Sequence, residues 1–313
     1  MALPKLLVMS QAIETMVKPP ESEFELVRLD ANPDRDAFLR ENGAGIALAL
    51  SSGMERLDAA RLALLPDLEL IVVVAAGTAA VDLDEAASRG IEVTNAGDLN
   101  SADVADFAIT LMLAHVRDVI GHDRYVREDR WPDARMKPGR SVGAQRVGIV
   151  GLGHIGQAIA ARLVPFGTEI AWWGPRAKPD ALWRRVGSLE ALAEWSTILI
   201  VAARGDDSSR GLISADVIRA LGPEGLIVNV SRGFVIDEQA MVAALKDGSL
   251  GGAALDVFEH EPFRGSEWAD VPNVLMAPHV AGATREAFSA VFAGALDNLR
   301  RHVAGQPVLR RVV

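Results

Sequence analysis

The amino-acid sequence predicts an α/β protein with two domains, each built on a parallel sheet. Three observations lead to this prediction. The chain has 313 residues, which is long for one hydrophobic core. Short and nearly continuous apolar runs alternate with segments of helical periodicity, a pattern typical of parallel strands covered by helices on both faces. The glycine motif Gly151-x-Gly153-x-x-Gly156 lies between a predicted strand and a predicted helix.

The first domain is expected over residues 1–98 and is completed by residues 284–313. Apolar runs predict its strands over residues 6–9, 24–28, 45–50, 70–74 and 91–94. A final helix is expected over residues 284–304, beyond the last strand of the chain. We expect this helix to return to the first domain.

The second domain is expected over residues 99–283. Its predicted strands, most of them buried on both faces, cover residues 147–150, 169–173, 197–202, 226–230, 253–257 and 274–276. A helix over residues 101–119, with Asn100 or Ser101 as N-cap, is expected to cross between the domains. One face of this helix comprises Val104, Phe107, Ala108, Leu111, Met112 and His115. Residues 120–145 are charged and contain Trp-Pro and Pro-Gly pairs, so they are expected to be irregular.

The composition narrows the function classes. The chain has 32 basic and 42 acidic residues, and a net charge of −10 argues against binding nucleic acid or an acidic membrane surface. No cysteine is present, which excludes disulfides and thiolate chemistry and fits a reducing cytoplasm. The N-terminal apolar patch is too short for a signal peptide, and no apolar stretch reaches the roughly 18 residues of a membrane span. We therefore expect a soluble, cytoplasmic protein that acts on small molecules without a metal.

The glycine motif predicts dinucleotide binding. Gly151 allows a tight turn after the strand, Gly153 lets the backbone approach a pyrophosphate, and Gly156 lets the next helix pack closely on the strand. The first N–H groups of that helix, which include those of His154 and Ile155, would face the phosphates at the positive end of the helix dipole. These five residues are candidate cofactor-binding residues.

Polar residues follow three strands of the second domain. Arg232 comes after the strand at 226–230, Asp256 and Glu261 come after the next strand, and His279 comes after the last. Because ligands bind at the carboxyl ends of such strands, we expect these residues to converge near the cofactor. Arg can hold a carboxylate and polarise a carbonyl, His can move a proton, and Glu can fix the His tautomer. Taken singly, each could be an ordinary surface or structural residue, but their joint placement favours a catalytic set.

Four segments resemble the D-2-hydroxyacid dehydrogenase family in order and in sequence. They are residues 151–156, 229–233, 254–262 and 277–284, supported by Thr94-Asn95 and by Val104-Ala-Asp106. The resemblance implies two Rossmann-like domains with parallel sheets, the cofactor domain being inserted in a flavodoxin-like substrate domain. It also implies a cleft between the domains and usually a homodimer. The family's catalytic Arg, Glu and His correspond to Arg232, Glu261 and His279.

The resemblance also assigns binding residues. In the family, backbone N–H groups of a turn in the first domain hold the substrate carboxylate, and the matching donors here are Ala76 and Gly77. Arg232 and His279 are the further substrate contacts that the resemblance implies. Alanines at 75 and 76, and Ala79 where the family often has Asp, depart from the usual pattern. The loop at 51–54 either lines the same pocket or is an ordinary surface turn. Further implied cofactor contacts are Val104, Val230, Ser231, Asp256, His279 and Gly282.

The residues after the second strand of the cofactor domain favour NADPH over NADH. An NAD-specific fold places a carboxylate there to bind the ribose 2′-hydroxyl. This chain instead continues with Gly174-Pro-Arg176-Ala-Lys178, so repulsion of a 2′-phosphate is absent and positive charge is present. Arg204, after the next strand, can add to that charge. The alternative is that Arg176 is merely solvated and either cofactor is accepted, because NADP-using relatives usually place Arg where Pro175 stands here.

The favoured hypothesis is NADPH-dependent reduction of a small 2-ketoacid, of the glyoxylate or hydroxypyruvate type, to the D-2-hydroxyacid. In this hypothesis His279, paired with Glu261, protonates the carbonyl oxygen while Arg232 holds the carboxylate. Two alternatives remain open. One is an NAD-linked D-2-hydroxyacid dehydrogenase that works in the oxidative direction. The other is a dinucleotide-sensing binding protein without catalysis, because the fold alone does not set the function.

Overall fold

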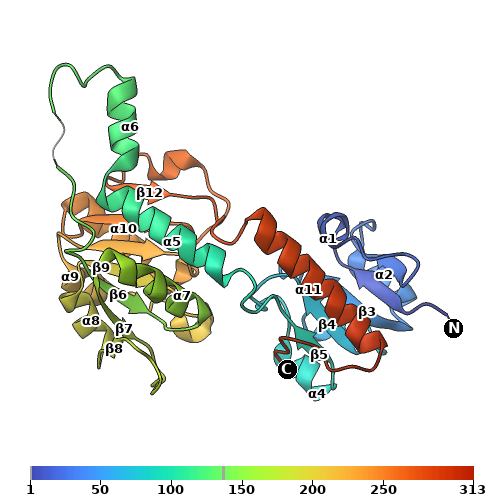
Figure 1. The fold of residues 1–313 in the computed structure, drawn as a ribbon. Helices are drawn as coiled ribbons and strands as arrows, with labels where there is room; N and C mark the ends of the chain where they lie inside the picture. Colours follow the sequence, from blue (N-terminus) through green and yellow to red (C-terminus); the bar gives the residue numbers. More distant parts are fainter. Residues whose placement is uncertain (1, 136–137) are drawn as a thin grey trace. The chain divides into compact units, whose positions relative to one another are not determined.

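The computed structural model describes residues 2–135 and 138–313 and divides them into two compact units (Figure 1). Unit 1 contains the chain up to Asn100 together with Arg285–Val313, and unit 2 is Ser101–Thr284. Unit 2 is therefore inserted into the sequence of unit 1.

Among its described residues, unit 1 has a five-stranded parallel sheet in the order β2-β1-β3-β4-β5. Its strands are β1 (Lys5–Val8), β2 (Glu25–Arg28), β3 (Ile46–Ser51), β4 (Leu70–Val73) and β5 (Glu92–Thr94). The 2-1-3-4-5 order is that of flavodoxin-like sheets, in which strand order reverses on either side of the first strand. The expected flavodoxin-like fold of this unit is confirmed.

Helices cover both faces of this sheet. α1 (Gln11–Val17) and α11 (Arg285–Val303) pack on one face. The opposite face carries α2 (Arg35–Asn42), α3 (Ala59–Leu62) and α4 (Leu83–Ser88). Each helix of the second group begins after an Asp whose carboxylate accepts the N–H three residues on, which satisfies one of the free donors at a helix start.

Unit 2 has, within its described residues, a seven-stranded parallel sheet in the order β12-β11-β10-β9-β6-β7-β8. The strands are β6 (Arg146–Val150), β7 (Glu169–Trp173), β8 (Arg184–Arg185), β9 (Ile198–Val201), β10 (Leu226–Asn229), β11 (Gly252–Leu255) and β12 (Val274–Met276). Strand β6 pairs with β7 on one side and with β9 on the other, so the order reverses at β6. The carboxyl end of β6 is consequently the place where this fold binds ligands.

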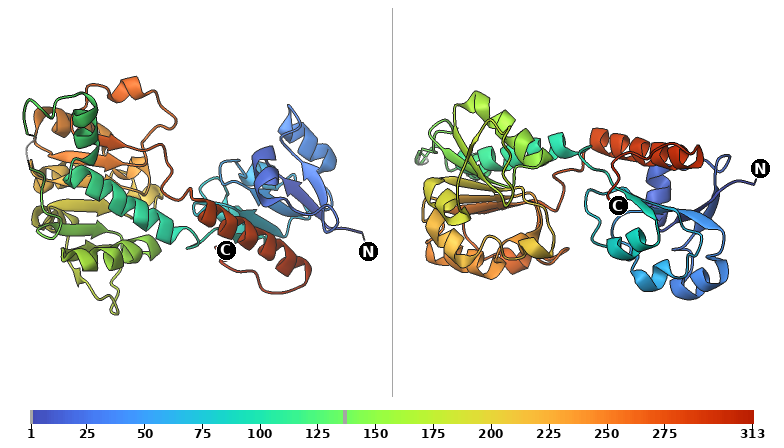
Figure 2. Two further views of the ribbon diagram at one scale, coloured as in Figure 1. Left: turned by 45° about the horizontal axis from the view of Figure 1, so that its top comes forward. Right: turned by 90° about the horizontal axis from the view of Figure 1, so that it is seen from below.

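Two layers of helices enclose the sheet of unit 2, and the right-hand view of Figure 2 shows the sheet between them. α5 (Ser101–Val116) and α7 (His154–Leu163) share one buried cluster with the sheet. The other face is covered by α8 (Leu189–Trp195), α9 (Ala215–Leu221) and α10 (Glu238–Asp247). The prediction of parallel strands buried on both faces is confirmed.

Two predictions for unit 2 were wrong or incomplete. The segment expected to be irregular contains helix α6 (Val119–Arg127), because its Trp-Pro and Pro-Gly pairs all lie beyond the helix and leave residues 119–127 free to coil. Residues 136–137 of that segment lie outside the described part of the chain. Strand β8 was missed because it is two arginines long and has no apolar signature.

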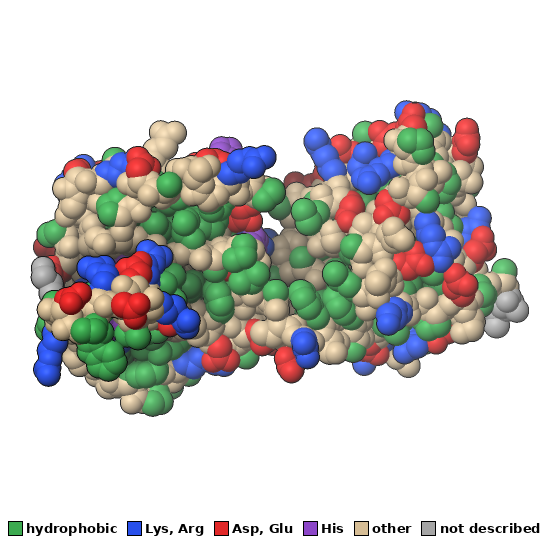
Figure 3. Space-filling view, turned by 90° about the horizontal axis from the view of Figure 1, so that it is seen from above, with side chains coloured by type: hydrophobic (Ala, Val, Ile, Leu, Met, Phe, Trp, Pro, Cys, Tyr) green, Lys and Arg blue, Asp and Glu red, His purple; other side chains and the backbone are tan. Residues whose placement is uncertain are grey.

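On the face drawn in Figure 3, acidic and basic side chains are interspersed over both units. Within the described residues, no helix is both long enough and apolar enough to cross a membrane.

Candidate active site

The turn from β6 into α7 is shaped by glycines. Gly151 has φ +91°, and a methyl group on it would lie 2.7 Å from the Cα of Ala203 in the neighbouring loop. A methyl group on Gly156 would lie 2.1 Å from the carbonyl oxygen of Gly151. Both distances are shorter than van der Waals contact, so these two positions require glycine.

The middle glycine of the motif, Gly153, faces open space. A methyl group on Gly153 would meet no described atom within 4 Å, and no side chain in the described chain caps the start of α7 at this residue. Helix α7 therefore has an uncapped N-terminus, which includes the N–H groups of His154 and Ile155. These N–H groups lie beside the open space at Gly153, which a larger side chain would occupy. A pyrophosphate fits this arrangement.

The loop after β7 carries the predicted adenosine-side residues. Gly174 is buried, whereas Arg176 and Lys178 are exposed. Arg204, after β9, forms an exposed ion pair with Asp206, its Nε lying 3.5 Å from Oδ2. Sequence reasoning missed Arg185 on β8, whose Nη2 donates to the carbonyl oxygen of Gly174 at 2.8 Å.

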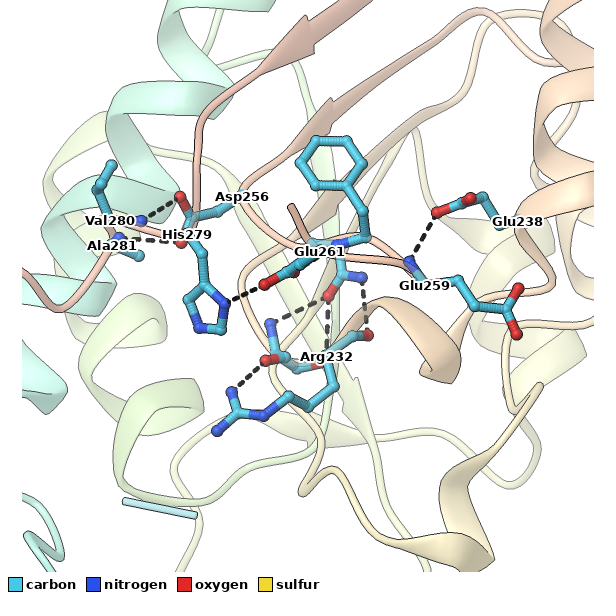
Figure 4. A network of polar contacts seen from close by, with 11 residues as sticks. Arg232, Glu238, Asp256, Glu259, Glu261, His279, Val280 and Ala281 are labelled. Atoms are coloured by element: carbon cyan, nitrogen blue, oxygen red, sulfur yellow. Dashed lines mark hydrogen bonds and ion pairs between the residues drawn. The ribbon is translucent and has the colours of Figure 1, made fainter. Parts of the chain in front are cut away.

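Glu261 and His279 form a close pair in unit 2 (Figure 4). Nδ1 of His279 lies 2.6 Å from Oε2 of Glu261, and Oε1 of Glu261 accepts the N–H of Phe258 at 2.8 Å. The side chain of His279 is 47% exposed. Because Nδ1 faces the carboxylate, Nε2 is the nitrogen left to exchange a proton with a ligand.

The backbone of His279 is held in an uncommon conformation. Its φ is +55°, in the left-handed region that costs a non-glycine residue about 1–2 kcal/mol. Its N–H donates to the carbonyl oxygen of Asp256 at 2.9 Å, and the Asp256 carboxylate accepts the N–H groups of Val280 and Ala281 at 2.8 and 2.9 Å (Figure 4). Asp256 thus fixes the turn that presents the imidazole.

The carboxyl group of Asp256 is buried, because only 1% of this residue is exposed. Burial raises the pKa of its carboxyl, and the two backbone N–H groups oppose that effect. Sequence reasoning named Asp256 as a cofactor contact only. The signal it lacked is long-range, because Asp256 and the turn that it holds are more than 20 residues apart.

Arg232 reaches the same region from the end of β10. The buried Asn229 orders its backbone, because Nδ2 of Asn229 donates to the Arg232 carbonyl at 3.1 Å. Nη1 of Arg232 donates to the carbonyl oxygen of Ser231 at 2.6 Å. Close packing brings this turn to the Glu261 loop, since a methyl group on Gly233 would lie 1.8 Å from the carbonyl carbon of Phe258. The structure therefore brings together three predicted catalytic residues at the carboxyl ends of β10, β11 and β12.

In unit 1, the loops that follow β3, β4 and β5 touch one another. The turn that contains Ala76 and Gly77 follows β4, and Nδ2 of Asn95 donates to the carbonyl oxygen of Ala76 at 2.6 Å. Gly53, with φ +87°, packs on this turn, since a methyl group on it would lie 3.2 Å from the Gly77 carbonyl oxygen. The loop at 51–54 is thus a direct neighbour of the predicted carboxylate-binding turn.

The remaining predicted cofactor contacts line the interior of unit 2. Val104 on α5 and Val230 after β10 belong to one buried cluster, which also includes Ala281. Ser231 is buried as well, and Gly282 lies in the turn after Ala281. Within the described residues, no three His, Asp or Glu side chains are grouped so that they could hold a metal ion.

This combination of a reversed parallel sheet, a glycine cradle at its central strand and a Glu-His pair at its ligand-binding edge defines an oxidoreductase of the dinucleotide-binding class. Over residues 109–281 the chain matches the NAD binding domain of the D-isomer specific 2-hydroxyacid dehydrogenases. The chain belongs to this family, and the resemblance seen in its sequence motifs is confirmed.

Relatives of known activity are similar over most of the chain. The 2-ketogluconate reductase of Gluconobacter oxydans is 39% identical over 249 residues, which cover 80% of each protein. Glyoxylate/hydroxypyruvate reductase A of Arabidopsis thaliana is 36% identical over 293 residues, which cover 94% of each.

Solved structures show the same similarity. A 2-hydroxyacid dehydrogenase from Ketogulonicigenium vulgare has a TM-score of 0.93 at 38% identity, covering 100% of this chain and 99% of the other. The NADPH-dependent glyoxylate/hydroxypyruvate reductase of Sinorhizobium meliloti, solved with NADP and malonate, has a TM-score of 0.90 at 34% identity, covering 100% and 97%.

Proposed function

We propose that this protein reduces a small 2-ketoacid, of the glyoxylate or hydroxypyruvate type, to the corresponding D-2-hydroxyacid with NADPH. The observation that carries the proposal is the 2.6 Å contact between Glu261 and His279 at the ligand-binding edge of a dinucleotide-binding sheet. The names of the relatives support the reductive direction, since they are reductases of glyoxylate, hydroxypyruvate and 2-ketogluconate.

The chemistry divides among three side chains. His279 gives a proton from Nε2 to the carbonyl oxygen of the substrate, and Glu261 holds the imidazole and stabilises its positive charge. Arg232 holds the substrate carboxylate and polarises the carbonyl. A bound nicotinamide supplies the hydride. The substrate contacts in unit 1 are the backbone N–H groups of Ala76 and Gly77, so unit 1 is the substrate domain and unit 2 the dinucleotide-binding domain.

Unit 2 also contains the cofactor contacts. The N–H groups of Gly153, His154 and Ile155 hold the pyrophosphate, because they stand at an uncapped helix start. Five further residues of unit 2 complete the proposed cofactor contacts. They are Val104 on α5, Val230 and Ser231 after β10, Asp256 after β11 and Gly282 after β12.

The cofactor is NADPH in preference to NADH. No carboxylate stands between Gly174 and Pro179, and Arg176, Lys178 and Arg204 are exposed cations near that position in the sequence or in the next strand-end loop. Positive charge without a carboxylate favours a 2′-phosphate over a 2′-hydroxyl. The Sinorhizobium meliloti reductase, whose structure holds NADP, supports the same preference.

The protein acts as a homodimer in the cytoplasm. Helix α6 supports the assembly, because Val119, Ile120 and Val126 on it are each about half exposed. Sedimentation of the purified protein tests this part of the proposal: a dimer is expected, and a monomer at micromolar concentration would contradict it.

A substrate panel tests the reaction. Purified protein is assayed with glyoxylate, hydroxypyruvate, pyruvate, phenylpyruvate and 2-ketogluconate, each with NADPH and with NADH. We expect the highest kcat/KM for glyoxylate or hydroxypyruvate with NADPH. A clear preference for NADH, or faster oxidation of D-2-hydroxyacids, would favour an NAD-linked dehydrogenase. Binding of NADPH with negligible turnover on every substrate would favour a dinucleotide sensor.

A further inference from the structure

Strand β8 at the edge of the unit 2 sheet consists of two adjacent arginines (Figure 1). It pairs with β7 so that Arg184 lies opposite Ala171 and Arg185 lies opposite Trp172. Charged residues on an edge strand are common, because they discourage pairing with other chains. The two arginines nevertheless make different contacts, and only one of them reaches the loop between β7 and β8.

Arg185 ties that loop to the sheet. Its Nη2 donates to the carbonyl oxygen of Gly174 at 2.8 Å, and its guanidinium lies 5.7 Å from the ring centre of Trp172. Trp172 is almost completely buried, and its Nε1 donates to the carbonyl oxygen of Trp183 at 3.0 Å. The loop of residues 174–183 is therefore fixed at both ends by the same Arg-Trp pair.

Arg184 makes its contact elsewhere. Its guanidinium lies 4.8 Å from the ring centre of Trp195, the last residue of α8. Arg184 and Arg185 thus carry the same charge at adjacent positions on one strand, but they contact different partners. Replacing each arginine in turn therefore distinguishes the effect of losing a positive charge from the effect of losing the hydrogen bond to Gly174.

The orientation of the Gly174 carbonyl determines the path of the loop that follows it. It belongs to the planar peptide group that joins Gly174 to Pro175, and proline fixes its own φ near −65°. Orienting this peptide group therefore also sets the direction in which the chain reaches Arg176, and two residues later Lys178. Both cations are exposed, so packing does little to place them.

We propose that Arg185 is a positioning residue for recognition of the adenosine 2′-phosphate. By holding the Gly174 carbonyl, it sets the loop so that Arg176 and Lys178 face that phosphate. The inference rests on the proposed preference for NADPH and deepens it, because it names a residue outside the loop that determines specificity.

Three variants test it: R185Q, R184Q as the matched control for loss of charge, and R185K. Calorimetric titration measures the binding of adenosine 2′,5′-bisphosphate and of AMP, which differ in the 2′-phosphate and require no turnover. Kinetics then give KM and kcat for NADPH and NADH, and thermal unfolding checks the fold of each variant.

We expect R185Q to weaken adenosine 2′,5′-bisphosphate binding about tenfold and to raise KM for NADPH by about as much, with AMP binding, kcat and KM for NADH within about twofold of wild type. R184Q should stay within about twofold for both ligands. R185K should recover part of the loss, because Lys keeps a donor and a charge but lacks the planar guanidinium that lies over the Trp172 ring.

Each other outcome is decisive. Equal losses in R184Q and R185Q would mean that charge alone acts and would overturn the positioning role, as would unchanged selectivity in R185Q. Equal losses for both ligands would mean a general structural role and would also overturn it. A wild type that binds both ligands equally would instead overturn the NADPH proposal, and the inference with it.

Discussion

Oε2 of Glu261 lies 2.6 Å from Nδ1 of His279, and the other carboxylate oxygen accepts the N–H of Phe258. Glu261 is therefore held by the backbone on one side and holds the imidazole on the other. The pair can act as a unit, in which the loss of either side chain disables the other.

Replacing His279 tests the proton donor. H279A should lower kcat for 2-ketoacid reduction by about 10²–10⁴-fold, the usual contribution of general acid catalysis, with the Kd for NADPH nearly unchanged. H122A, which changes a histidine on α6, is the control and should keep wild-type kcat. Unchanged turnover in H279A would refute the assignment.

Replacing Glu261 tests whether the pair acts as a unit. E261Q keeps the size of the side chain but removes its negative charge, so kcat should fall about 10–100-fold. The double variant E261Q/H279A should be no slower than H279A, because effects within one catalytic unit are not additive. Fully additive losses in kcat would show that the two side chains act independently.

Asp256 should be required for the turn that presents His279. Asn has one acceptor oxygen where Asp256 offers two to Val280 and Ala281, so D256N leaves one N–H facing an amide group. We expect a loss of about 1–3 kcal/mol in the free energy of unfolding, together with a lower kcat. Denaturant unfolding measures the loss of stability, and steady-state kinetics measure kcat. The control is D216N, which changes an exposed carboxylate in the first turn of α9. Equal stability of both variants would contradict the role of Asp256.

Alanine substitutions at two glycines of the motif should have different effects, one on stability and the other on NADPH affinity. In G156A the new methyl group meets the Gly151 carbonyl oxygen, so the protein should be destabilised. In G153A the methyl group enters open space, so thermal unfolding should change little while NADPH affinity falls. Calorimetric titration with NADPH separates the two. Wild-type affinity in G153A would show that the pyrophosphate does not lie at this position.

Glu55 predicts a pH dependence in the stability of unit 1. Burial raises the pKa of its carboxyl, but hydrogen bonds from Ser52 and Ser51 outweigh burial and lower it below the ordinary 4.5. A lowered pKa means that the stabilisation is complete above pH 4.5 and is lost as the pH falls through the lower value of the folded state. E55Q should therefore be less stable at pH 7, by about 0.5–1 kcal/mol for a partly solvated group.

Denaturant unfolding of wild type and E55Q across this pH range measures that difference. It should shrink as the pH falls below 4.5, because protonated Glu55 resembles Gln. A difference that stays constant down to pH 3 would contradict the account.

The sequence predicted the features that depend on neighbours along the chain. The limits of β7 and β12 were correct to the residue, and helix α11 was correct within one residue at each end, because apolar periodicity and flanking breakers are local signals. Helix α6 was missed, since its exposed apolar residues lie among charges that suggested an irregular segment.

The contacts that organise the site could not be predicted in the same way. Asp256 meets Val280 and Arg185 meets Gly174 across strands, and neither pairing leaves a pattern in one sequence. The left-handed backbone of His279 could not be predicted either. Hydrogen bonds from distant residues impose it, against the preference of a non-glycine residue for negative φ.

The most direct test of the account is the product formed from hydroxypyruvate. Purified protein is incubated with hydroxypyruvate and NADPH, consumption of NADPH is followed, and the glycerate formed is resolved by chiral chromatography, with H279A in parallel. We expect one D-glycerate for each NADPH oxidised by the wild type and almost none from H279A. Formation of L-glycerate, or NADPH binding without oxidation, would contradict it.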